Sequence, residues 1–532
     1  MNHPGRMANP KIPQNYFVSS TDKPCENGGA TPKRIKRDDM DKVVNLFVSA
    51  AKRAKEANFD IIEMQFGHGY LFAQFISPLV NDRTDAYGGN FENRIKFPLE
   101  VLEAVKKSVD LPIIARLSGD EMIPDGIKLP EMIAFSKILA EKGVSAIHVS
   151  AGSACSTPPW YFQHMFMPKG KTWEMAKEIK EKINIPVVFV GRINTFEDID
   201  KVRNEYAADY IAVGRSLVAD PNFIGKYLDK EDKGLAKPCL ACAEGCLGGV
   251  KSGQGLKCLV NPLVGKETGH VENLKPPKKY AIVGGGLAGM EATITLKMRG
   301  HSVVLYEKDR LGGQFNLASL PPNKSSLSKL VDYYKEELNV LDIPVVSKEV
   351  SADELLNENY DGVILATGSV PAVPPIKGLK EYFWAEVLNE GYFIENKKVL
   401  VIGGGLIGLE ISSALLKGNN KVIIVEMLDE VGRGMEMIEK TLILQALKGG
   451  GVEIYLNSKV EEIIDNKAVI TGEKNIEIDG IDHIILTAGM KSYNPLEDKL
   501  KHKIPLYVIG DAKQTGNAQD AIRDAYETAI KL

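Results

Sequence analysis

The chain has 532 residues, 44% of them hydrophobic and 26% charged, and at roughly 100–200 residues per domain this length predicts several packed units. The composition excludes a disordered, collagenous or coiled-coil protein. Lysine and arginine number 66 and aspartate and glutamate 70, which gives a net charge of -4. Because no basic block stands out, this balance argues against nucleic acid or an anionic membrane as the main partner and favours small molecules.

The sequence contains no targeting signal that we can identify. No stretch reaches the roughly 18 consecutive apolar residues of a membrane-spanning helix. The first six residues, Met-Asn-His-Pro-Gly-Arg, lack the basic and apolar regions of a secretory signal. We therefore expect a cytoplasmic protein without a membrane partner.

From residue 38 to about 232, amphipathic helical stretches alternate with short apolar strands. Helices are predicted at 43–57 and 92–109, and strands at 59–64, 111–116, 146–150, 186–190 and 210–213. Repeated βα units in one direction imply a parallel sheet, and this many without a dinucleotide fingerprint favour a TIM (β/α)8-type barrel. About six strands can be counted, including a stub at the amino terminus, so the predicted barrel is amino-terminally incomplete.

A connector rich in proline and lysine at 273–279 predicts a domain boundary, and an internal repeat follows it. The glycine-rich segment at 281–289 returns at 401–408, each time after an apolar strand and before a helix. The next strand ends in an acidic residue at the same offset in both copies. The fingerprint residues are Gly284, Gly286, Gly289 and Glu307 in the first copy and Gly403, Gly405, Gly408 and Glu426 in the second.

This pattern predicts two Rossmann-like nucleotide sites. The glycines let the backbone approach a pyrophosphate, the helix amino terminus stabilises its charge, and the acid accepts hydrogen bonds from ribose hydroxyls. The alternative is that the glycines serve only two tight strand-to-helix turns. With the Gly-Asp pair at 510–511, the pattern resembles the two-dinucleotide flavoprotein reductases. The resemblance implies that the first fingerprint, with Glu307, Gln314 and Asp511, holds FAD, and that the inserted second domain holds the nicotinamide nucleotide.

The second fingerprint favours NADH over NADPH. A carboxylate at Glu426 would repel the 2'-phosphate of NADPH. Arg433 lies nearby in the sequence and keeps NADPH open as an alternative.

Six cysteines divide into two groups. Cys25 and Cys155 are isolated in the sequence, and the other four crowd together as Cys239, Cys242, Cys246 and Cys258. In a reducing compartment such crowding indicates metal rather than disulfides, and four thiolates suit zinc or an iron–sulfur cluster. The three-residue gap is irregular for zinc knuckles, and a cluster between two flavin-type regions can pass single electrons. The sequence therefore favours a 4Fe-4S cluster, with structural zinc as the alternative.

The barrel segment carries motifs that closely resemble the old yellow enzyme superfamily. They are Gln-Phe-Gly-His-Gly-Tyr-Leu at 65–71, Ser-Pro at 77–78, Asn-Asp-Arg-Thr-Asp at 81–85, Tyr-Gly-Gly at 87–89 and Glu-Asn-Arg at 92–94. With the cysteine pattern and the doubled fingerprint, the likeness extends over nearly the whole chain. It is similar to the iron–sulfur flavoprotein branch, which contains 2,4-dienoyl-CoA reductase, 2-enoate reductase, trimethylamine dehydrogenase and bile-acid and steroid enoyl reductases.

This resemblance implies FMN at the carboxyl ends of the barrel strands. Arg116 matches the arginine beside the electron-rich edge of the isoalloxazine. The phosphate-binding loops after the last two strands match Gly191, Arg192, Gly214 and Arg215, where backbone amides and guanidinium groups suit a phosphate. An ordinary loop salt bridge is the alternative role for Arg192 and Arg215.

The resemblance also implies a catalytic set of Gln65, His68 and Tyr70. Two donors polarise a substrate carbonyl, reduced flavin delivers hydride to the β-carbon, and Tyr70 protonates the α-carbon. Old yellow enzymes commonly have histidine where this chain has Gln65, so carboxylate-like substrates should be held less tightly. The alternatives are a satisfied core histidine for His68 and simple packing for Tyr70.

The loop at 153–164 lies where the family lines its substrate pocket. Its aromatic residues suggest a flat, apolar substrate, with a hydrophobic surface loop as the rival interpretation. Dienoyl-CoA reductases have a second catalytic histidine in this loop, and the sequence does not register it onto His164. Cys155 is equally plausible as a lining residue.

The family pattern begins with two further strands and a glutamine just before the His-x-Gly-Arg motif. This chain begins inside the third strand, at Met-Asn-His-Pro-Gly-Arg. A parallel barrel without two adjacent strands leaves unpaired edges. We therefore expect the sequence to be a truncation or misassigned start of a longer protein, or else to have impaired FMN binding.

The resulting hypothesis is an NADH-dependent ene-reductase that passes electrons from NADH through FAD and the cluster to FMN and then to a small unsaturated carbonyl substrate. Rival hypotheses are an amine dehydrogenase of trimethylamine dehydrogenase type and an NADH diaphorase with a non-catalytic barrel. The subunit count is left open, with a homo-oligomer as one option. The predicted domains are a barrel at 1–235, a cluster segment at 236–275, an FAD domain at 276–392 and 482–532, and an NAD(H) domain at 393–481.

Overall fold

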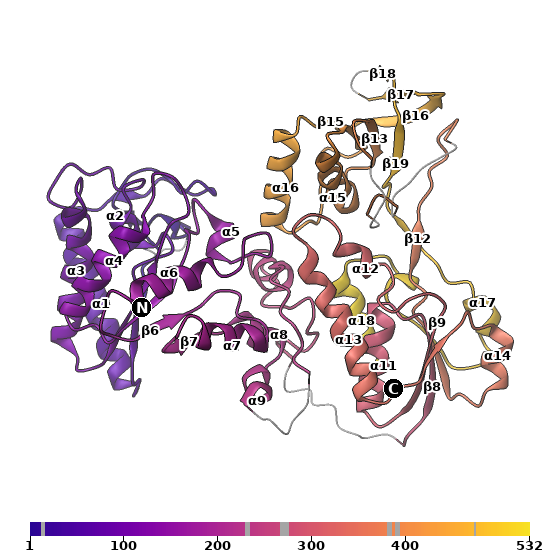
Figure 1. Cartoon of the computed structure of the whole chain (residues 1–532), viewed down its shortest axis with the longest axis horizontal. Helices are drawn as coiled ribbons and strands as arrows, with labels where there is room; N and C mark the ends of the chain where they lie inside the picture. The colour runs from indigo at the N-terminus through magenta and orange to yellow at the C-terminus, as the bar shows by residue number, and fades with distance from the viewer. Residues whose placement is uncertain (12–15, 229–234, 267–275, 380–385, 389–393, 473–474) are drawn as a thin grey trace. The chain divides into compact units, whose positions relative to one another are not determined.

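The computed structural model describes two compact units, Met1–Ser216 and Leu217–Leu532 (Figure 1). The described residues are 1–11, 16–228, 235–266, 276–379, 386–388, 394–472 and 475–532. Part of the predicted connector at 273–279 therefore lies outside the described residues. None of the helices in these ranges combines the length and apolar character needed to span a bilayer.

The first unit is built on one sheet of five parallel strands in chain order. The strands are β3 (Ile62–Gln65), β4 (Ile113–Ser118), β5 (Ala146–Ser150), β6 (Val187–Phe189) and β7 (Tyr210–Ile211). The helices are α1 (Arg37–Glu56), α2 (Leu71–Ile76), α3 (Phe91–Ser108), α4 (Leu129–Glu141), α5 (Pro158–Tyr161), α6 (Lys171–Lys180) and α7 (Phe196–Asn204). Helical crossovers between successive parallel strands are the barrel-type alternation that the sequence predicts.

Local capping and burial explain where these elements begin and which face they bury. The helix predicted at 43–57 begins earlier, at Arg37, because the Asp39 carboxylate accepts a hydrogen bond from the Lys36 N–H at 3.2 Å. Met40, Val43 and Phe47 recur at a helical spacing and are fully or almost fully buried. Every residue of β5 is buried, as expected for a parallel strand covered on both faces.

The amino-terminal stub that we expected as a sixth strand is not a strand of this sheet. The Met1 carbonyl accepts a hydrogen bond from the Gln65 N–H at 3.0 Å. The chain then turns into the short 3-10 helix η1 (Gly5–Met7). A separate two-residue parallel pair follows, formed by β1 (Val18–Ser19) and β2 (Lys33–Arg34).

The second unit contains two parallel sheets, one for each glycine-rich fingerprint. The outer sheet has the order β10-β9-β8-β11-β21 and the inserted sheet the order β15-β14-β13-β19. Their strands are β8 (Lys279–Val283), β9 (Ser302–Glu307), β10 (Val345–Ser347), β11 (Gly362–Leu365), β21 (Leu506–Val508), β13 (Lys398–Ile402), β14 (Lys421–Val425), β15 (Glu453–Tyr455) and β19 (His483–Leu486). Because β19 pairs with β13, the inserted sheet extends past the predicted boundary at residue 481.

Helices and smaller strands complete the second unit. The antiparallel strands are β16 (Lys459–Ile464), β17 (Lys467–Thr471) and β18 (Ile476–Ile478) in one sheet and β12 (Ser369–Pro371) and β20 (Met490–Ser492) in another. The helices include α9 (Phe223–Leu228), α11 (Leu287–Met298), α13 (Ser328–Val340), α14 (Ala352–Asn357), α15 (Leu406–Leu415), α16 (Met437–Gly449), α17 (Glu497–Leu500) and α18 (Ala518–Ala529).

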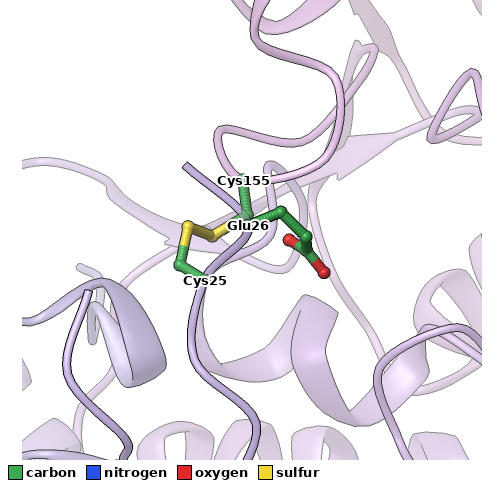
Figure 2. A group of neighbouring side chains, drawn as sticks. All are labelled: Cys25, Glu26 and Cys155. Carbon is green, nitrogen blue, oxygen red and sulfur yellow. A yellow bond between two sulfur atoms is a disulfide. The ribbon is translucent and has the colours of Figure 1, made fainter. Parts of the chain in front are cut away.

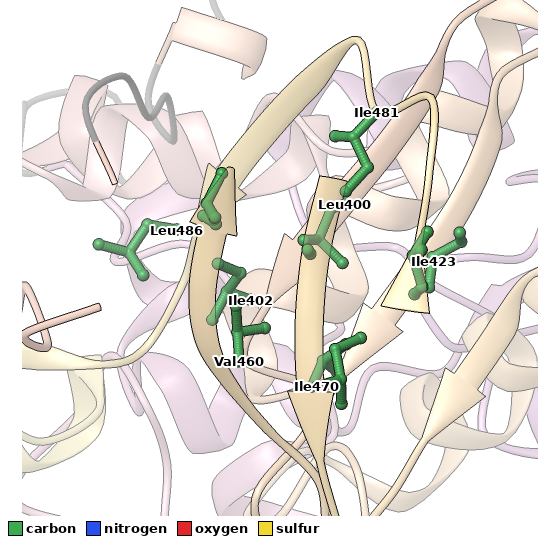
Figure 3. Packing of buried hydrophobic residues seen from close by; sticks show 11 residues of the cluster. Leu400, Ile402, Ile423, Val460, Ile470, Ile481 and Leu486 are labelled. Atoms are coloured by element: carbon green, nitrogen blue, oxygen red, sulfur yellow. The ribbon is translucent and has the colours of Figure 1, made fainter. Parts of the chain in front are cut away.

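The inserted sheet is held to its antiparallel neighbour by an apolar core. Leu400 and Ile402 of β13 pack in one buried cluster with Val460 of β16 and Ile470 of β17 (Figure 3). Burying large aliphatic side chains contributes about 1.5–3 kcal/mol each. This packing holds the second fingerprint on a rigid base.

Candidate active site

The barrel site lies at the carboxyl ends of β3 and β4. Gln65, the last residue of β3, is registered opposite Arg116 of β4. His68 follows in the loop after β3, and Tyr70 immediately precedes α2. The structure therefore brings the predicted catalytic residues and the predicted flavin-side arginine to one end of one sheet, where barrel enzymes build their sites.

Gln65 orients His68. Its amide Nε2 lies 3.2 Å from His68 Nδ1, and its Oε1 accepts a hydrogen bond from the Gly67 N–H at 2.9 Å. Burial, and then the charges of Arg116 and His148, hold the pKa of His68 well below its ordinary value. The ring is therefore neutral. Since the amide donates to Nδ1, the hydrogen-bond network assigns the ring proton to Nε2.

The backbone of His68 is fixed in an uncommon conformation. Its φ is 64°, in the left-handed region, and its N–H donates to the Ser118 hydroxyl at 2.8 Å. His68 Nε2 is buried and has no hydrogen-bond partner within the described residues. A buried N–H without a partner is a donor poised for a ligand.

Tyr70 has a hydrogen-bonded partner that the sequence did not predict. Its hydroxyl lies 3.0 Å from the hydroxyl of Tyr161, which comes from α5 after β5. The Tyr161 ring also packs edge-on against His68, with ring centroids 4.7 Å apart. Burial, and then the hydrogen bond with Tyr70, raise the pKa of Tyr161, so the Tyr161 hydroxyl is protonated. Tyr161 lay among the aromatic residues expected to line the pocket, but its contact with Tyr70 carries no sequence signal.

A charged network on the strands surrounds Arg116. The Glu63 carboxylate lies 2.7 Å from His148 Nδ1 and 3.8 Å from Arg116 Nη1. Burial opposes ionisation of Glu63, but the hydrogen bond from His148 and the charges of His148 and Arg116 outweigh it and lower its pKa. Sequence reasoning missed Glu63 and His148. Each of the two is a polar residue inside an otherwise apolar strand, and that is the sequence signal that could have identified it.

The residues predicted to bind a phosphate lie in the loops after β6 and β7. Gly191 has a φ of 115°, and a Cβ there would collide with the Thr172 hydroxyl. Arg192 donates to the Met167 carbonyl at 2.5 Å, and Arg215 donates to the Gln163 carbonyl at 3.1 Å.

Unsatisfied polar atoms test whether a flavin fits here. Gly214 faces open space, with no atom within 4 Å of the position of a Cβ. Several buried polar atoms of this unit lack a hydrogen-bond partner across the described ranges: His68 Nε2, Arg116 Nε, His148 Nε2, Thr172 Oγ1 and Arg215 Nη1. Because buried polar groups are normally paired, these atoms fit a large polar ligand with a phosphate, as FMN is.

Cys25 and Cys155, which are isolated in the sequence, meet in the structure. They form a disulfide with a Cα–Cα distance of 5.4 Å across 130 residues of sequence (Figure 2). Cys155 is therefore tied to the amino-terminal segment. His164, whose role the sequence left open, is fully buried, and its Nδ1 accepts a hydrogen bond from the Phe166 N–H.

Both dinucleotide fingerprints have the geometry that the sequence predicts. Gly284 and Gly403 have φ values of 108° and 107°, and a Cβ at either would collide with the backbone of the neighbouring strand end. The acids are bound at the turn: Glu307 accepts from the Gly285 N–H and Glu426 from the Gly404 N–H, both at 2.6 Å. No atom lies within 4 Å of a Cβ built at Gly286 or Gly405. That open space suits a pyrophosphate at a helix amino terminus.

Gln314 and Asp511, predicted to hold FAD with the first fingerprint, are linked through Ser369. Gln314 donates to the Ser369 carbonyl at 2.5 Å, and the Ser369 hydroxyl donates to Asp511 at 3.0 Å. The Gly516 N–H donates to the other oxygen of Asp511 at 3.1 Å. The structure thus brings Gln314 and Asp511 together.

The surroundings of Glu426 bear on the nicotinamide nucleotide. Arg433, which kept NADPH open, pairs with Asp429 at 2.9 Å and with Glu430 at 3.3 Å. Its charge is therefore met by two carboxylates. The loop after Glu426 carries a net negative charge that opposes a 2'-phosphate.

In the sequence, the four remaining cysteines lie between the barrel motifs and the first dinucleotide fingerprint. They form no disulfide. Burial raises the pKa of the Cys242 thiol, and it raises that of Cys258 to about 11. Four thiolates are a ligand set that suits either zinc or an iron–sulfur cluster.

The fold and these sites define a flavin-dependent and dinucleotide-binding oxidoreductase. The sequence profile of the NADH:flavin oxidoreductase / NADH oxidase family matches residues 9–233, and that of the pyridine nucleotide-disulphide oxidoreductases matches residues 278–520. The chain is 37% identical to an NADH oxidase of Thermoanaerobacter brockii over 549 residues, covering 100% of this chain and 84% of that protein.

Two further proteins extend the comparison. A cinnamate reductase of Clostridium sporogenes is 32% identical, covering 95% of this chain and 79% of that protein. A 2-naphthoyl-CoA reductase in complex with 2-naphthoyl-CoA shares the fold, with a TM-score of 0.91 at 24% identity, covering 100% of this chain and 84% of that chain. The chain therefore belongs to the NADH:flavin oxidoreductase / NADH oxidase family, in the iron–sulfur flavoprotein branch of the old yellow enzyme superfamily. The family resemblance and the fold class that the sequence predicts are both confirmed.

Proposed function

We propose that this chain is an NADH-dependent ene-reductase that reduces an activated C=C bond conjugated to a carbonyl group. The observation that carries the proposal is the buried, unpartnered His68 Nε2–H beside the Tyr70 hydroxyl at the end of β3. The His68 N–H suits a hydrogen bond to a carbonyl oxygen, and the Tyr70 hydroxyl suits proton transfer to the α-carbon beside that carbonyl group. The name of the cinnamate reductase supports this substrate class.

His68, Gln65 and Tyr70 have separate roles in the proposed reaction. His68 is neutral, so its Nε2–H donates to the substrate carbonyl oxygen and polarises the conjugated double bond. Gln65 holds the tautomer through Nδ1 and keeps a second amide hydrogen for the same oxygen. Tyr70 transfers its hydroxyl proton to the α-carbon, and the hydrogen bond from Tyr161 stabilises the oxygen from which that proton departs.

Arg116, with Arg192 and Arg215, would hold FMN in the barrel, and the two fingerprints would hold FAD and NADH. When bound, the nicotinamide, the flavins and a 4Fe-4S cluster on the four cysteines supply hydride and single-electron transfer. Arg116 would supply a fixed cation to stabilise the negative charge of a reduced flavin. Glu426 and its acidic loop select NADH by repelling a 2'-phosphate.

The rival amine dehydrogenase is less supported. The N,N-dimethylglycine/sarcosine dehydrogenase of Chromohalobacter salexigens matches 74% of this chain at 31% identity, against 95% at 32% for the cinnamate reductase. The aromatic loop that lines the site favours a flat unsaturated acyl or enone substrate.

The test is NADH oxidation by anaerobically purified protein with and without cinnamate, a cyclic enone or sarcosine. We expect cinnamate or the enone to accelerate NADH oxidation with formation of the saturated product, and iron, FMN and FAD to be present. Protein that contains all three cofactors but oxidises NADH at the same rate with every acceptor would contradict an ene-reductase. Reduction of a dye alone would support a diaphorase.

A further inference from the structure

The disulfide between Cys25 and Cys155 ties the substrate-side loop to the amino-terminal segment. Cys25 lies between β1 and β2, and Cys155 lies in the loop between β5 and α5. Both side chains are buried, Cys155 at 2% exposure and Cys25 at 9%. Cys25 is the less buried of the two, and its neighbours in the sequence, Pro24 and Glu26, are exposed.

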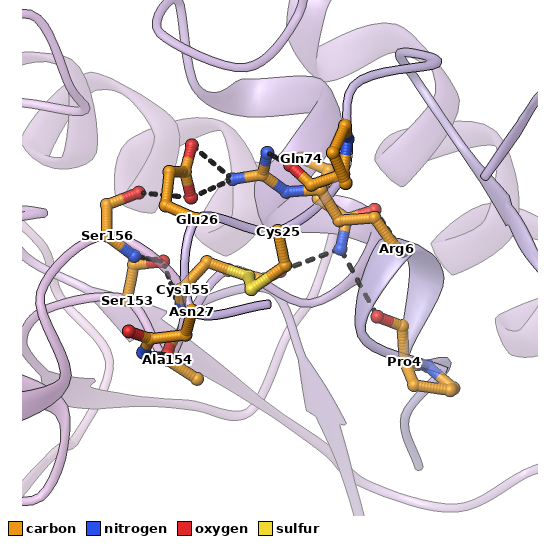
Figure 4. Close-up of a disulfide and its surroundings, with 12 residues drawn as sticks. Pro4, Arg6, Cys25, Glu26, Asn27, Gln74, Ser153, Ala154, Cys155 and Ser156 are labelled. Atoms are coloured by element: carbon orange, nitrogen blue, oxygen red, sulfur yellow. Dashed lines mark hydrogen bonds and ion pairs between the residues drawn. A yellow bond between two sulfur atoms is a disulfide. The ribbon is translucent and has the colours of Figure 1, made fainter. Parts of the chain in front are cut away.

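A set of polar contacts surrounds the disulfide (Figure 4). The buried Arg6 guanidinium donates to the Pro24 carbonyl at 3.0 Å and pairs with Glu26 at 3.0 Å. Two hydrogen bonds cross from this segment to the loop of Cys155: Asn27 to the Ala154 carbonyl at 2.9 Å and Ser156 to Glu26 at 3.3 Å. Both lie at exposed positions, where water competes for each partner. The disulfide is the one covalent tie across this gap among the described residues.

The same loop rests on the proposed catalytic residues. The Ala154 N–H, one residue before Cys155, donates to the His68 carbonyl at 3.0 Å. Ser153 forms a β-bridge with His68. The loop then enters α5, whose last residue Tyr161 is hydrogen-bonded to Tyr70. A movement of this loop therefore changes the position of His68 and the contact of Tyr161 with Tyr70 together.

We propose that Cys25 and Cys155 form a thiol–disulfide exchange site that controls the substrate loop, and hence the rate at which the barrel reduces its substrate. In the disulfide form the loop is fixed on His68. In the dithiol form the loop is held by hydrogen bonds alone: from Ala154 to the His68 carbonyl, from Thr157 to the Glu121 carbonyl, and the two exposed ones. The part of this inference that concerns catalysis rests on the proposed function.

The exchange reaction balances with a dithiol as the reductant. A thiolate of the reductant attacks Cys25 Sγ, the bond to Cys155 breaks, and Cys155 leaves as a thiolate that takes up a proton. The second thiol of the reductant then displaces Cys25, which is also protonated. Two electrons pass to the protein pair, and the reductant becomes a cyclic disulfide.

The experiment equilibrates the holoenzyme with graded ratios of reduced and oxidised dithiothreitol. Alkylation and peptide mapping report Cys25 and Cys155 separately from the four cluster cysteines. Hydrogen–deuterium exchange of peptides covering residues 150–165 reports the loop without any substrate. We expect faster exchange in this segment on reduction, a loss of kcat/KM for cinnamate of about 10- to 100-fold, as for a small misplacement of catalytic groups, and unchanged NADH-to-dye transfer.

Variants separate the pair from other effects of the reductant. The double variant Cys25→Ala with Cys155→Ala should behave as the reduced protein at every ratio. Asn27→Ala, which removes a crossing hydrogen bond but keeps the disulfide, should leave the oxidised protein close to wild type. Redox-dependent turnover that persists in the double variant, or a loop whose hydrogen exchange is the same in both states, would overturn the inference. Exchange that responds while no enone or enoate is reduced in either state would overturn the proposed function and leave the switch standing.

Discussion

The two dinucleotide fingerprints and the barrel site are built in opposite ways. Each fingerprint is one continuous strand–turn–helix followed by the next strand, and its acid is bound at its own glycine turn. The barrel site takes Gln65 and His68 from the end of β3, Arg116 from β4 and Tyr161 from the helix after β5. The fingerprint is a local motif, whereas the barrel site depends on strand register and on a loop that a distant segment holds.

This difference predicts different responses to mutation. A change in a fingerprint should affect one cofactor and leave the other sites intact. A change in the barrel should affect the chemistry at the C=C bond and leave electron entry intact. We propose that the cysteine segment carries electrons from the fingerprints to the barrel. A change in this segment should therefore abolish substrate reduction and keep electron entry from NADH, although both sites are unchanged.

The largest expected effect comes from the cluster. In Cys258→Ser, one of four thiolate ligands is lost, so iron content should fall and NADH-driven reduction of cinnamate should be abolished. NADH-to-dye transfer should remain, because the fingerprints are untouched. Iron analysis, electron paramagnetic resonance and both assays check this. A variant that loses zinc and keeps full turnover would show that the site is structural.

Tyr70→Phe tests the chemistry of the barrel. Loss of a general acid lowers turnover by about 10²- to 10⁴-fold. We expect this loss in cinnamate or enone reduction, with NADH-to-dye transfer and FMN content at wild-type levels. Equal loss in both assays would remove the proposed role of Tyr70.

The two acids provide a matched pair at the fingerprints. Glu426→Ala removes charge-assisted hydrogen bonds to a ribose, each worth about 1.5–3 kcal/mol, so KM for NADH should rise roughly 10- to 100-fold and the preference over NADPH should shrink. Glu307→Ala, the equivalent change in the first copy, should instead lower FAD content at unchanged affinity for NADH. The same response from both variants would contradict the assignment of the two nucleotides.

Buried histidines give the barrel unit a pH dependence. Burial lowers the pKa of His3 to about 4 and that of His68 well below its ordinary value. In the unfolded chain both return to about 6.5, so the unfolded state binds protons that the folded state does not as the pH falls from 6.5 towards 4. Stability is therefore full above pH 6.5 and is lost below it, by about 2 kcal/mol at pH 5 for His3, and His68 acts in the same direction.

Urea unfolding at pH 7 and pH 5 measures this loss. His68→Asn should flatten the dependence, because asparagine tolerates the left-handed backbone and does not titrate. His502→Asn is the matched control, since His502 is exposed and has a φ of 65°. An equal pH dependence in the two variants would contradict the buried neutral state of His68.

The smallest effect is expected for Tyr161→Phe. It removes one hydrogen bond to Tyr70, worth about 0.5–1.5 kcal/mol, so cinnamate reduction should slow by roughly 2- to 10-fold. The pH profile of kcat should shift, because the Tyr70 hydroxyl loses its partner. A rate and a pH profile identical to wild type would show that Tyr161 only lines the pocket.

Much of the fold could be predicted, because its signals are local. The βα alternation predicted the strands of the first unit to within about three residues, and the doubled fingerprint predicted both parallel sheets of the second. The register of β3 against β4 was not visible, yet it decides that Gln65 lies opposite Arg116. The helix α1 begins six residues before the predicted start because its cap is polar and breaks the apolar periodicity.

The site could be predicted only where a family motif covered it. Gln65, His68 and Tyr70 lie in one stretch of six residues, and that stretch carries the resemblance. Tyr161 is 91 residues from Tyr70, and His148 is 85 residues from Glu63. Contacts between such distant residues leave no periodicity or spacing in a single sequence, so reasoning from the sequence missed both pairs.

The sequence by itself determined the class of protein, the two nucleotide motifs and the grouping of four cysteines, because each depends on residues a few positions apart whose backbone geometry is local. Only the tertiary structure decided that Cys25 meets Cys155, that Arg433 is met by acids, and that a second tyrosine lies against Tyr70. Those pairings form when strands and loops are brought together by burial of the core, and burial is not specific to any one distant partner until the chain has folded.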